Sequence, residues 1–147
     1  MTFSSEDPWI RTRNGKPQIG AFATRSRTTR AEDIVAFSEM SGDYNPLHYD
    51  EALARESIFG RLIVQGGVTT ALLNAAVAED LPGPGTVFLG VEWKFTKAVG
   101  IGENLTARVE VVSVRDDKPI CTLSTTILDA EGSPCLTGFA TTYTVPA

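Results

Sequence analysis

Apolar and polar residues alternate along four segments in the second half of the chain, with the period of two that is typical of a half-buried β-strand. The segments are residues 86–96, 105–114, 120–128 and 136–145. In the first, one face is expected to carry Val87, Leu89, Val91, Trp93 and Phe95. Short connectors rich in Gly, Asp and Pro separate the segments. The pattern therefore predicts four long strands in an antiparallel meander.

The first half of the chain predicts one more strand and two helices. A weaker alternation over residues 18–27 favours a strand. Thr29 and Glu32 have the spacing of a capping box, which predicts a helix from there to about Met40. Asp50 can cap a short helix that runs through Ala54.

A segment from Val68 to Ala78 is apolar on nearly every side, which is typical of a buried helix. It ends at Glu79 and Asp80, before the helix-stopping pair Pro82-Gly83. Asn74 is the strongly polar residue in its middle, and a buried amide needs hydrogen-bond partners. One buried helix and a curved antiparallel sheet predict an α+β fold in which the sheet wraps around the helix.

Length and charge limit the classes of protein to consider. A chain of 147 residues is long enough for one domain with its own core, and we expect an N-terminal arm (1–18) before a single domain (19–147). The net charge of −5 argues against nucleic-acid binding. The polar start is unlike a signal peptide, and the apolar runs are too short to span a bilayer, so we expect a cytoplasmic protein without a membrane partner.

Metal binding is also not expected. The chain has one histidine and no C-x-x-C motif, so the usual ligands of a zinc site are missing. Cys121 and Cys135 lie in strand-like segments and are expected to be buried thiols.

The stretch S-G-D-Y-N-P-L-H, from Ser41 to His48, contains the single histidine and an aspartate, Asp43, five positions before it. Gly42 and Pro46 end the preceding helix and shape a loop, because glycine allows unusual backbone angles and proline restricts the residue before it. Such a loop can aim a carboxylate and an imidazole at one water molecule for acid–base chemistry. Spacing alone favours the alternative, in which the aspartate caps a helix and the histidine is packed in the core.

Gly66 and Gly67 stand just before the apolar helix. The first N–H groups of a helix have no partner within it and carry the positive end of its dipole. They could stabilise negative charge on a carbonyl oxygen. The alternative is that both glycines only allow close packing of the helix start, and spacing does not decide between the two.

The S-G-D-Y-N-P-L-H stretch, the L-P-G-x-G segment from Leu81 and the R-D-D-K-P-I turn from Arg115 resemble the (R)-specific enoyl-CoA hydratases, the MaoC-like hot-dog family. The resemblance runs from about residue 30 to 145. It implies a hot-dog fold, a homodimer and no cofactor. The implied reaction is hydration of a trans-2-enoyl thioester to the (R)-3-hydroxyacyl product, and its reverse.

The resemblance also implies roles for individual residues. Asp43 and His48 would hold the reacting water, and the main-chain N–H groups of Gly66 and Gly67 would bind the thioester oxygen. Asn74 falls where relatives often have a small hydroxyl residue that supports the aspartate. The other supporting residues expected are Asn45 and Gln65. The chain departs from the family at Gln65, where many relatives have histidine, and at Gly67, where many have a bulky apolar residue.

The carrier of the acyl group stays open at this stage. A CoA thioester would need local cations for its phosphates, and four basic residues are candidates. They are Arg55, Arg61, Lys94 and Lys97. The alternatives are a dehydratase that acts on acyl-carrier-protein thioesters, a non-catalytic hot-dog partner subunit, and, with least support, a thioesterase.

Overall fold

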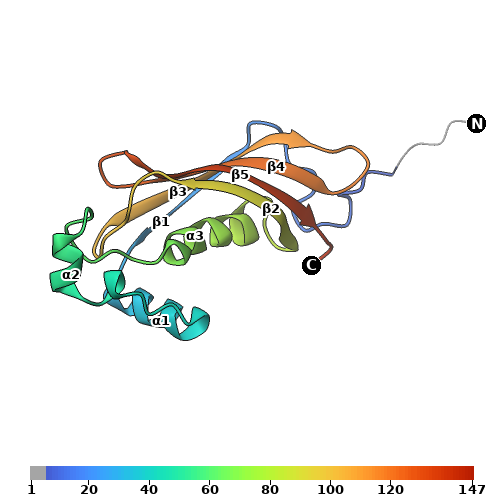
Figure 1. Cartoon of the computed structure of the whole chain (residues 1–147). Helices are drawn as coiled ribbons and strands as arrows, with labels where there is room; N and C mark the ends of the chain where they lie inside the picture. The colour runs from blue at the N-terminus through green and yellow to red at the C-terminus, as the bar shows by residue number, and fades with distance from the viewer. Residues whose placement is uncertain (1–5) are drawn as a thin grey trace, which may run out of the picture.

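The fold is a five-stranded antiparallel sheet that curves over one central helix, in a computed structural model that describes residues 6–147 (Figure 1). The strands are β1 (Phe22–Thr28), β2 (Thr86–Phe95), β3 (Asn104–Val114), β4 (Ile120–Leu128) and β5 (Pro134–Thr144). Their order in the sheet is β1-β3-β4-β5-β2. The pairs β3–β4 and β4–β5 form a meander as predicted, but β2 pairs with β5 and not with β3, so the prediction of a four-stranded meander is wrong for this strand. The reason is that β1 occupies the edge of β3 where β2 was expected. The hot-dog prediction is confirmed. The part of the expected arm at residues 1–5 lies outside the described residues.

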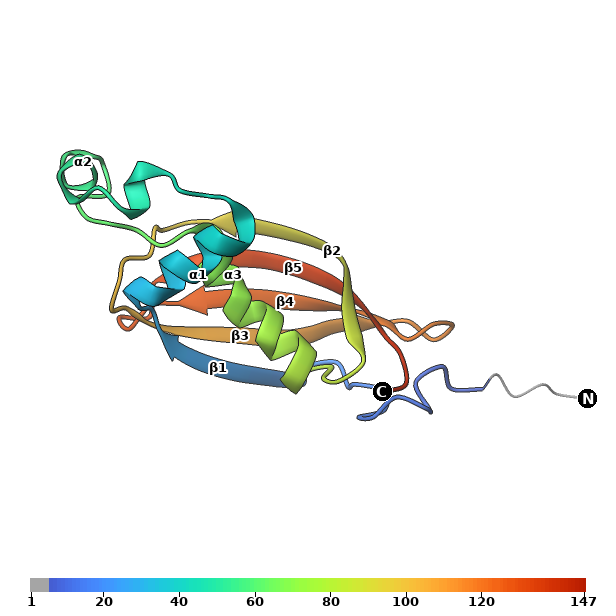
Figure 2. The same ribbon diagram turned by 90° about the horizontal axis from the view of Figure 1, so that it is seen from below.

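The central helix α3 (Gly66–Ala75) lies along the concave face of the sheet, and α1 (Ala31–Ser41) covers α3 from the other side (Figures 1 and 2). A π-helical turn (Ala76–Asp80) extends α3. The short helix α2 (Glu51–Glu56) and the 3-10 turn Pro46–His48 lie at one end of the sheet, and the C-terminus lies at the other (Figure 1). Within residues 6–147, no helix is both long and apolar enough to cross a membrane.

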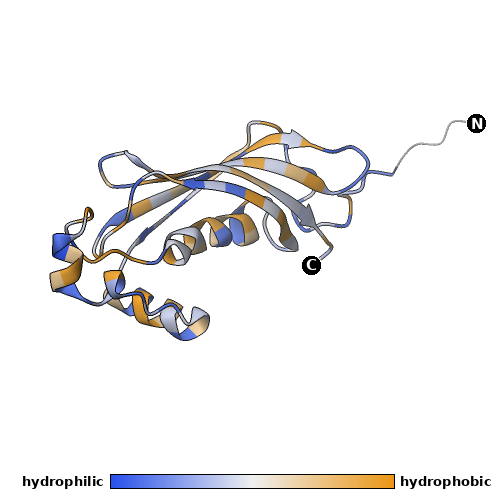
Figure 3. Cartoon of the chain, viewed as in Figure 1, coloured by the Kyte–Doolittle hydropathy of each residue, from blue (hydrophilic) through white to orange (hydrophobic). Residues whose placement is uncertain are grey.

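The core lies between α3 and the concave face of the sheet. On β4, and on β3 from Leu105 to Val111, every second residue is buried, which is the alternation expected of strands with one face on a core. Figure 3 shows apolar positions recurring along the strands and on α1. Cys121 and Cys135 are free buried thiols, as predicted, and burial raises the pKa of both.

Helix α3 is not buried on all sides in the single chain. Its residues Leu72 and Leu73 are buried, as is Val77 in the π-helical turn, but Ala71 and Asn74 on the other side of α3 are exposed. The expectation of a buried Asn74 amide is therefore wrong for this chain by itself, because the sheet covers one side of the helix and α1 covers only part of the other.

Strand β2 departs from the expected alternation. The register against β5 shifts between Phe88 and Gly90, so an extra residue forms a β-bulge. Val87 pairs with Tyr143, whereas Val91 pairs with Ala140. Because opposed residues share a face and Tyr143 and Ala140 lie on opposite faces of β5, Val87 does not share a face with Val91. A pattern of apolar residues on its own does not reveal an inserted residue.

Two boundaries near the N-terminus also differ from the prediction. Strand β1 begins at Phe22 rather than near residue 18, because the chain before it turns at Gly20. The predicted capping box is displaced by one residue: Arg30 is the N-cap of α1, and its N–H donates to Asp33 Oδ2 at 2.9 Å. The Thr29 hydroxyl instead donates to the carbonyl of Gly100 at 2.7 Å.

The N-terminal segment contributes to the core of its own chain. Trp9 is fully buried and belongs to the same apolar cluster as Leu73 and Val111, whereas Ile10 is 64% exposed. Asn14 donates to the carbonyl of Pro82 at 3.0 Å, which ties the segment to the loop after α3. The division into an arm and a domain stays a prediction.

Candidate active site

The loop that carries the candidate pair begins where α1 ends. Gly42 takes the left-handed conformation with φ of 84°, and its N–H donates to the carbonyl of Ser38 at 2.8 Å. Two Asx contacts then shape the loop: Asp43 Oδ1 accepts from the N–H of Asn45, and Asn45 Oδ1 accepts from the N–H of Leu47, each at 3.1 Å. Asn45 therefore starts the 3-10 turn that ends at His48.

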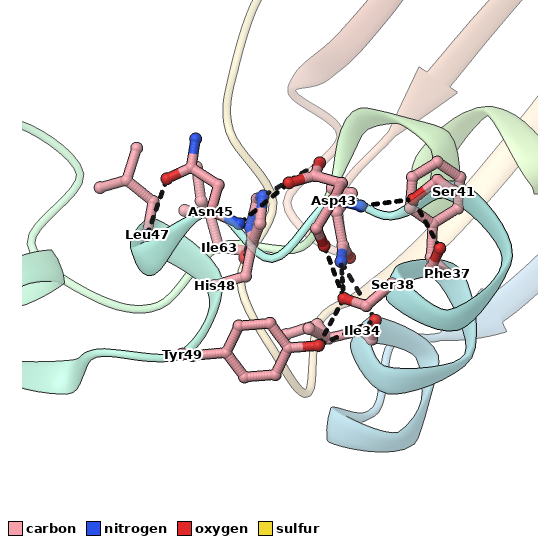
Figure 4. Close-up of polar contacts among 11 residues, drawn as sticks. Ile34, Phe37, Ser38, Ser41, Asp43, Asn45, Leu47, His48, Tyr49 and Ile63 are labelled. Atoms are coloured by element: carbon pink, nitrogen blue, oxygen red, sulfur yellow. Dashed lines mark hydrogen bonds and ion pairs between the residues drawn. The ribbon is translucent and has the colours of Figure 1, made fainter.

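The loop brings the two predicted residues together. Asp43 Oδ2 lies 3.6 Å from His48 Nε2, which is too long for a direct hydrogen bond (Figure 4). At this separation, one water molecule to the side of the pair can lie within hydrogen-bond distance of both atoms. The His48 ring is 7% exposed and the Asp43 side chain 39%, so the histidine is fixed and the carboxylate can be reached.

The tautomer of His48 follows from its other contact. His48 Nδ1 lies 2.7 Å from the carbonyl oxygen of Ile63. A carbonyl only accepts, so Nδ1 carries the hydrogen, and in the neutral ring Nε2 presents a lone pair toward Asp43. The Ile63 N–H also donates to the carbonyl of Leu47 at 3.3 Å, so Ile63 holds the turn by two bonds.

The geometry defines what the pair can do with a water molecule. An ionised Asp43 and a neutral His48 are both acceptors on the sides that face each other. A water shared by the two, to one side of the pair, would donate one hydrogen to each, and its lone pairs would point away from the pair. This is the orientation in which the oxygen is a nucleophile and both acceptors are placed to take its proton.

The start of α3 is confined between two phenylalanine rings. A Cβ on Gly66 would lie 3.1 Å from Phe95 Cε1, and a Cβ on Gly67 would lie 2.0 Å from Phe37 Cε2. A side chain at Gly67 would therefore have to displace the Phe37 ring of α1, which gives a physical reason for the missing bulky residue. Within residues 6–147, neither glycine N–H donates to another group of the protein. Both interpretations of the pair of glycines are compatible with these contacts.

Two cavities lie beside this helix start. One, of about 400 Å³, is lined by Ile63, Gly66, Thr69 and Phe95, among others. It includes both the residue that anchors His48 and the first glycine of α3. The second, of about 530 Å³, lies between α1, β1 and α3 and touches Gly67 and Phe37. Neither Asp43 nor His48 lines either cavity, but the first contains Ile63, whose carbonyl binds His48 Nδ1, so it is the better candidate for a thioester.

The remaining predicted residues fall in different surroundings. Gln65 is 1% exposed, and its Nε2 donates to the carbonyl of Ile34 at 3.1 Å and to Ser38 Oγ at 3.0 Å. Asn74 is exposed. It lies eight residues after Gly66, about 12 Å along the helix, so within one chain it does not support the aspartate.

Of the four candidate cations, two are engaged with carboxylates. Arg61 pairs with Glu103 and Lys97 pairs with Asp129. Arg55 has no such partner within residues 6–147, and with Arg61 it lines a cavity of about 410 Å³. This cavity includes Gly60 and Leu62, and the 400 Å³ cavity beside Gly66 includes Phe59 and Ile63, so the same segment of chain lines both.

Sequence reasoning missed two polar residues of the site, Ser38 and Tyr49. Ser38 Oγ donates to the main-chain oxygen of Asp43 at 2.7 Å and also contacts the Tyr49 hydroxyl (Figure 4). Nothing in the sequence marks Ser38 as a residue of the site, because it lies in a predicted helix among apolar and surface positions. Tyr49 directly follows His48, which was the available hint.

Comparison with known proteins decides the family. Residues 15–131 match the family described as the MaoC like domain. The chain belongs to the MaoC-like family. It is 39% identical over 123 residues to the (R)-specific enoyl-CoA hydratase of Aeromonas caviae, which covers 84% of this chain and 92% of that protein. The crystal structure of the (R)-hydratase from A. caviae superposes with a TM-score of 0.84 and 37% identity, over 88% of this chain and 98% of that one.

A third relative is named as a dehydratase of acyl-carrier-protein thioesters, the alternative activity. The mitochondrial 3-hydroxyacyl-[acyl-carrier-protein] dehydratase FERN of Solanum lycopersicum is 30% identical over 126 residues, 84% of this chain and 75% of that protein. These MaoC-like relatives are hydratases and dehydratases, so the expected enzyme class is confirmed.

Proposed function

We propose that this MaoC-like protein adds water to trans-2-enoyl-CoA to give (R)-3-hydroxyacyl-CoA and catalyses the reverse dehydration. The observation that carries the proposal is the gap of 3.6 Å between Asp43 Oδ2 and His48 Nε2, with the Nδ1 of His48 committed to Ile63. Two acceptors that face one water are what an addition of water to a polarised double bond requires. The names of the A. caviae relatives support the substrate and the stereochemistry.

In the proposed reaction the water oxygen forms a bond to Cβ of the enoyl group while one proton of the water passes to the Asp43–His48 pair. Electrons of the double bond move toward the thioester carbonyl, whose oxygen gains negative charge. The pair then returns the proton to Cα on the same face, so the enzyme ends unchanged. Either residue of the pair can take the proton.

The main-chain N–H groups of Gly66 and Gly67 are the proposed donors to the carbonyl oxygen. They lie at the positive end of the α3 dipole and donate to no other group within residues 6–147. Gly66 lines the cavity that also contains Ile63, the residue whose carbonyl binds His48 Nδ1. Asn45 and Gln65 are proposed to support this site, Asn45 through the turn and Gln65 through α1.

The second candidate is action on acyl-carrier-protein thioesters, which the tomato relative favours. Arg55 and the adjoining cavities favour CoA, because the phosphates of CoA need a cation near the pantetheine arm. The two carriers are separated by comparing kcat/KM for the same enoyl group on CoA and on acyl carrier protein. A strong preference for the protein carrier would contradict the CoA proposal. The homodimer and the cytoplasmic location stay predictions.

A further inference from the structure

We infer that Ser38 is a positioning residue of this site: its hydroxyl fixes the aspartate loop relative to the first turn of α3. The inference rests on the proposed function. Ser38 lies on α1 and has no exposed surface. Its hydroxyl meets three groups, which belong to Asp43, Tyr49 and Gln65. Each of these residues is, or directly adjoins, a member of the proposed catalytic machinery.

The direction of every bond at this hydroxyl can be assigned. Serine has one hydrogen to donate and two lone pairs to accept with. The main-chain oxygen of Asp43, at 2.7 Å, only accepts, so the Ser38 hydrogen goes there. Gln65 Nε2, at 3.0 Å, donates to Ser38, and the Tyr49 hydroxyl takes the second lone pair as a donor. The bonding capacity of Ser38 is thus fully used.

The glutamine amide has one orientation in this network. Its Nε2 lies 3.1 Å from the carbonyl of Ile34 as well as beside Ser38, and only the NH₂ end can donate to that carbonyl. Gln65 is the N-cap residue of α3 and immediately precedes Gly66. Its two bonds therefore tie the first turn of α3 to α1.

The other two links lead to the acid–base pair. Ser38 binds the main chain of Asp43 itself, and Tyr49 directly follows His48. One buried oxygen consequently connects the carboxylate loop, the histidine turn and the proposed oxyanion donors. Their spacing must be held closely, because a displacement of about 1 Å at reacting groups can lower the rate by about 100-fold.

Ser38 differs from a serine that only satisfies its own helix. Such a residue commonly donates to the carbonyl four positions earlier, as Ser41 does to Phe37 at 2.7 Å. Ser38 instead donates forward to Asp43, outside the helix. Local helix stability does not require this bond, whereas the position of the loop does.

The test compares Ser38→Ala and Tyr49→Phe with a matched control, Thr125→Val. Thr125 is a buried residue of β4 whose hydroxyl has no partner, so its isosteric replacement removes a buried oxygen away from the site. We expect Ser38→Ala to lower kcat for enoyl-CoA hydration by about 10- to 100-fold with little change in KM. Tyr49→Phe should lower kcat by a smaller factor, and Thr125→Val should leave it unchanged.

Two further readouts separate positioning from mere stability. His48 is the single histidine, so its ring signals in a ¹H–¹⁵N spectrum report on this site alone, with or without turnover. These signals should move in Ser38→Ala and Tyr49→Phe and stay in place in Thr125→Val. In the Ser38→Ala background, Tyr49→Phe should cost less kcat than in the wild type, because the two groups act through one contact.

A folded Ser38→Ala protein with wild-type kcat and unmoved His48 signals would overturn the inference, whatever its melting temperature. If Ser38→Ala does not fold, the inference is tested by kcat and the His48 signals of Tyr49→Phe, because this variant removes one oxygen and keeps the ring. A wild type that does not hydrate enoyl-CoA would contradict the proposed function instead. The His48 signals would then still support or overturn the positioning role.

Discussion

His48 Nε2 faces Asp43 Oδ2 across 3.6 Å, and the Nδ1 of the same ring is bound to the Ile63 carbonyl at 2.7 Å. The second contact determines the chemistry of the first, since it leaves Nε2 as an acceptor in the neutral ring. The proposed hydration follows from this arrangement.

The first prediction concerns the pair itself. Asp43→Asn and His48→Ala should each lower kcat/KM for enoyl-CoA hydration by at least about 100-fold, the usual scale for a positioned acid or base. Because both residues act on one water, the double variant should lose much less than the product of the single losses. Steady-state kinetics on the four proteins measures this. Near wild-type turnover in either single variant would show that the pair is structural.

The second prediction concerns the oxyanion donor. Gly66→Pro removes one N–H, and the site tolerates proline well: Gly66 is the first helical position, and Gln65 has φ of −62° and ψ of 147°, the extended conformation that suits a residue before proline. The Phe95 ring has to shift slightly, because it lies 3.1 Å from the new Cβ. Loss of one donor should cost about 3–4 kcal/mol of transition-state stabilisation, measured as kcat/KM.

The control for this experiment is a melting curve that shows a folded Gly66→Pro protein. Gly67→Pro is the companion variant, but its Cβ would collide with Phe37, so it has to pass the same control before its kinetics are interpreted. If both proteins fold and both keep wild-type kcat/KM, the helix start is not the oxyanion site.

The third prediction concerns the carrier. If Arg55 binds a phosphate of CoA, Arg55→Ala should raise KM for enoyl-CoA by about tenfold, the effect of one charge-assisted hydrogen bond, and leave kcat nearly unchanged. A pantetheine thioester of the same acyl group lacks the nucleotide and serves as the control substrate. Its KM should not respond. Equal effects on both substrates would show that Arg55 does not recognise the nucleotide.

The fourth prediction concerns stability and pH. The hydrogen bonds from Lys97 and from the main-chain N–H of Ser133 hold the pKa of Asp129 below its usual range. A lowered folded-state pKa stabilises the fold above the unfolded pKa of about 3.9, and the contribution is lost as pH falls through the folded value. Asp129→Asn should therefore lower the melting temperature at pH 7, and the difference from wild type should shrink below about pH 4.

Melting curves at pH 7, 5 and 3 test this, provided that the wild type unfolds reversibly. Asp117→Asn is the matched control, because its carboxylate pairs with Arg115 on an exposed turn. It should change the melting temperature little. A gap between Asp129→Asn and wild type that stays constant down to pH 3 would contradict the assignment.

Much of the fold was predictable because its strands alternate cleanly and its turns carry turn residues, as in residues 120–128, where the predicted and observed strands coincide. The exceptions have local causes. The bulge after Phe88 inserts one residue without a mark in the hydropathy pattern, and burial of Thr29 moves the helix cap to Arg30. Asn74 lies on the side of α3 that the sheet does not cover.

Contacts of the site between residues close in sequence were predictable, and contacts between residues from distant segments were not. Asp43 and His48 lie in one short loop, so their meeting followed from the loop. The carbonyl of Ile63 sets the tautomer of His48 from 15 residues away, and Gln65 reaches Ser38 from 27 residues away. Contacts of this separation depend on how α1 and α3 pack, which residue spacing does not encode.

Hydration of crotonyl-CoA by the wild-type protein in D₂O tests the central claim most directly. Loss of the enoyl absorbance reports the reaction, chiral analysis of the product reports the face attacked at Cβ, and NMR reports where deuterium enters Cα. The proposed function predicts the (R)-3-hydroxy product, with one deuterium at Cα on the face that receives the oxygen. Formation of the (S) product would contradict it. So would a folded wild-type protein that hydrates neither crotonyl-CoA nor any enoyl-CoA with a longer acyl chain.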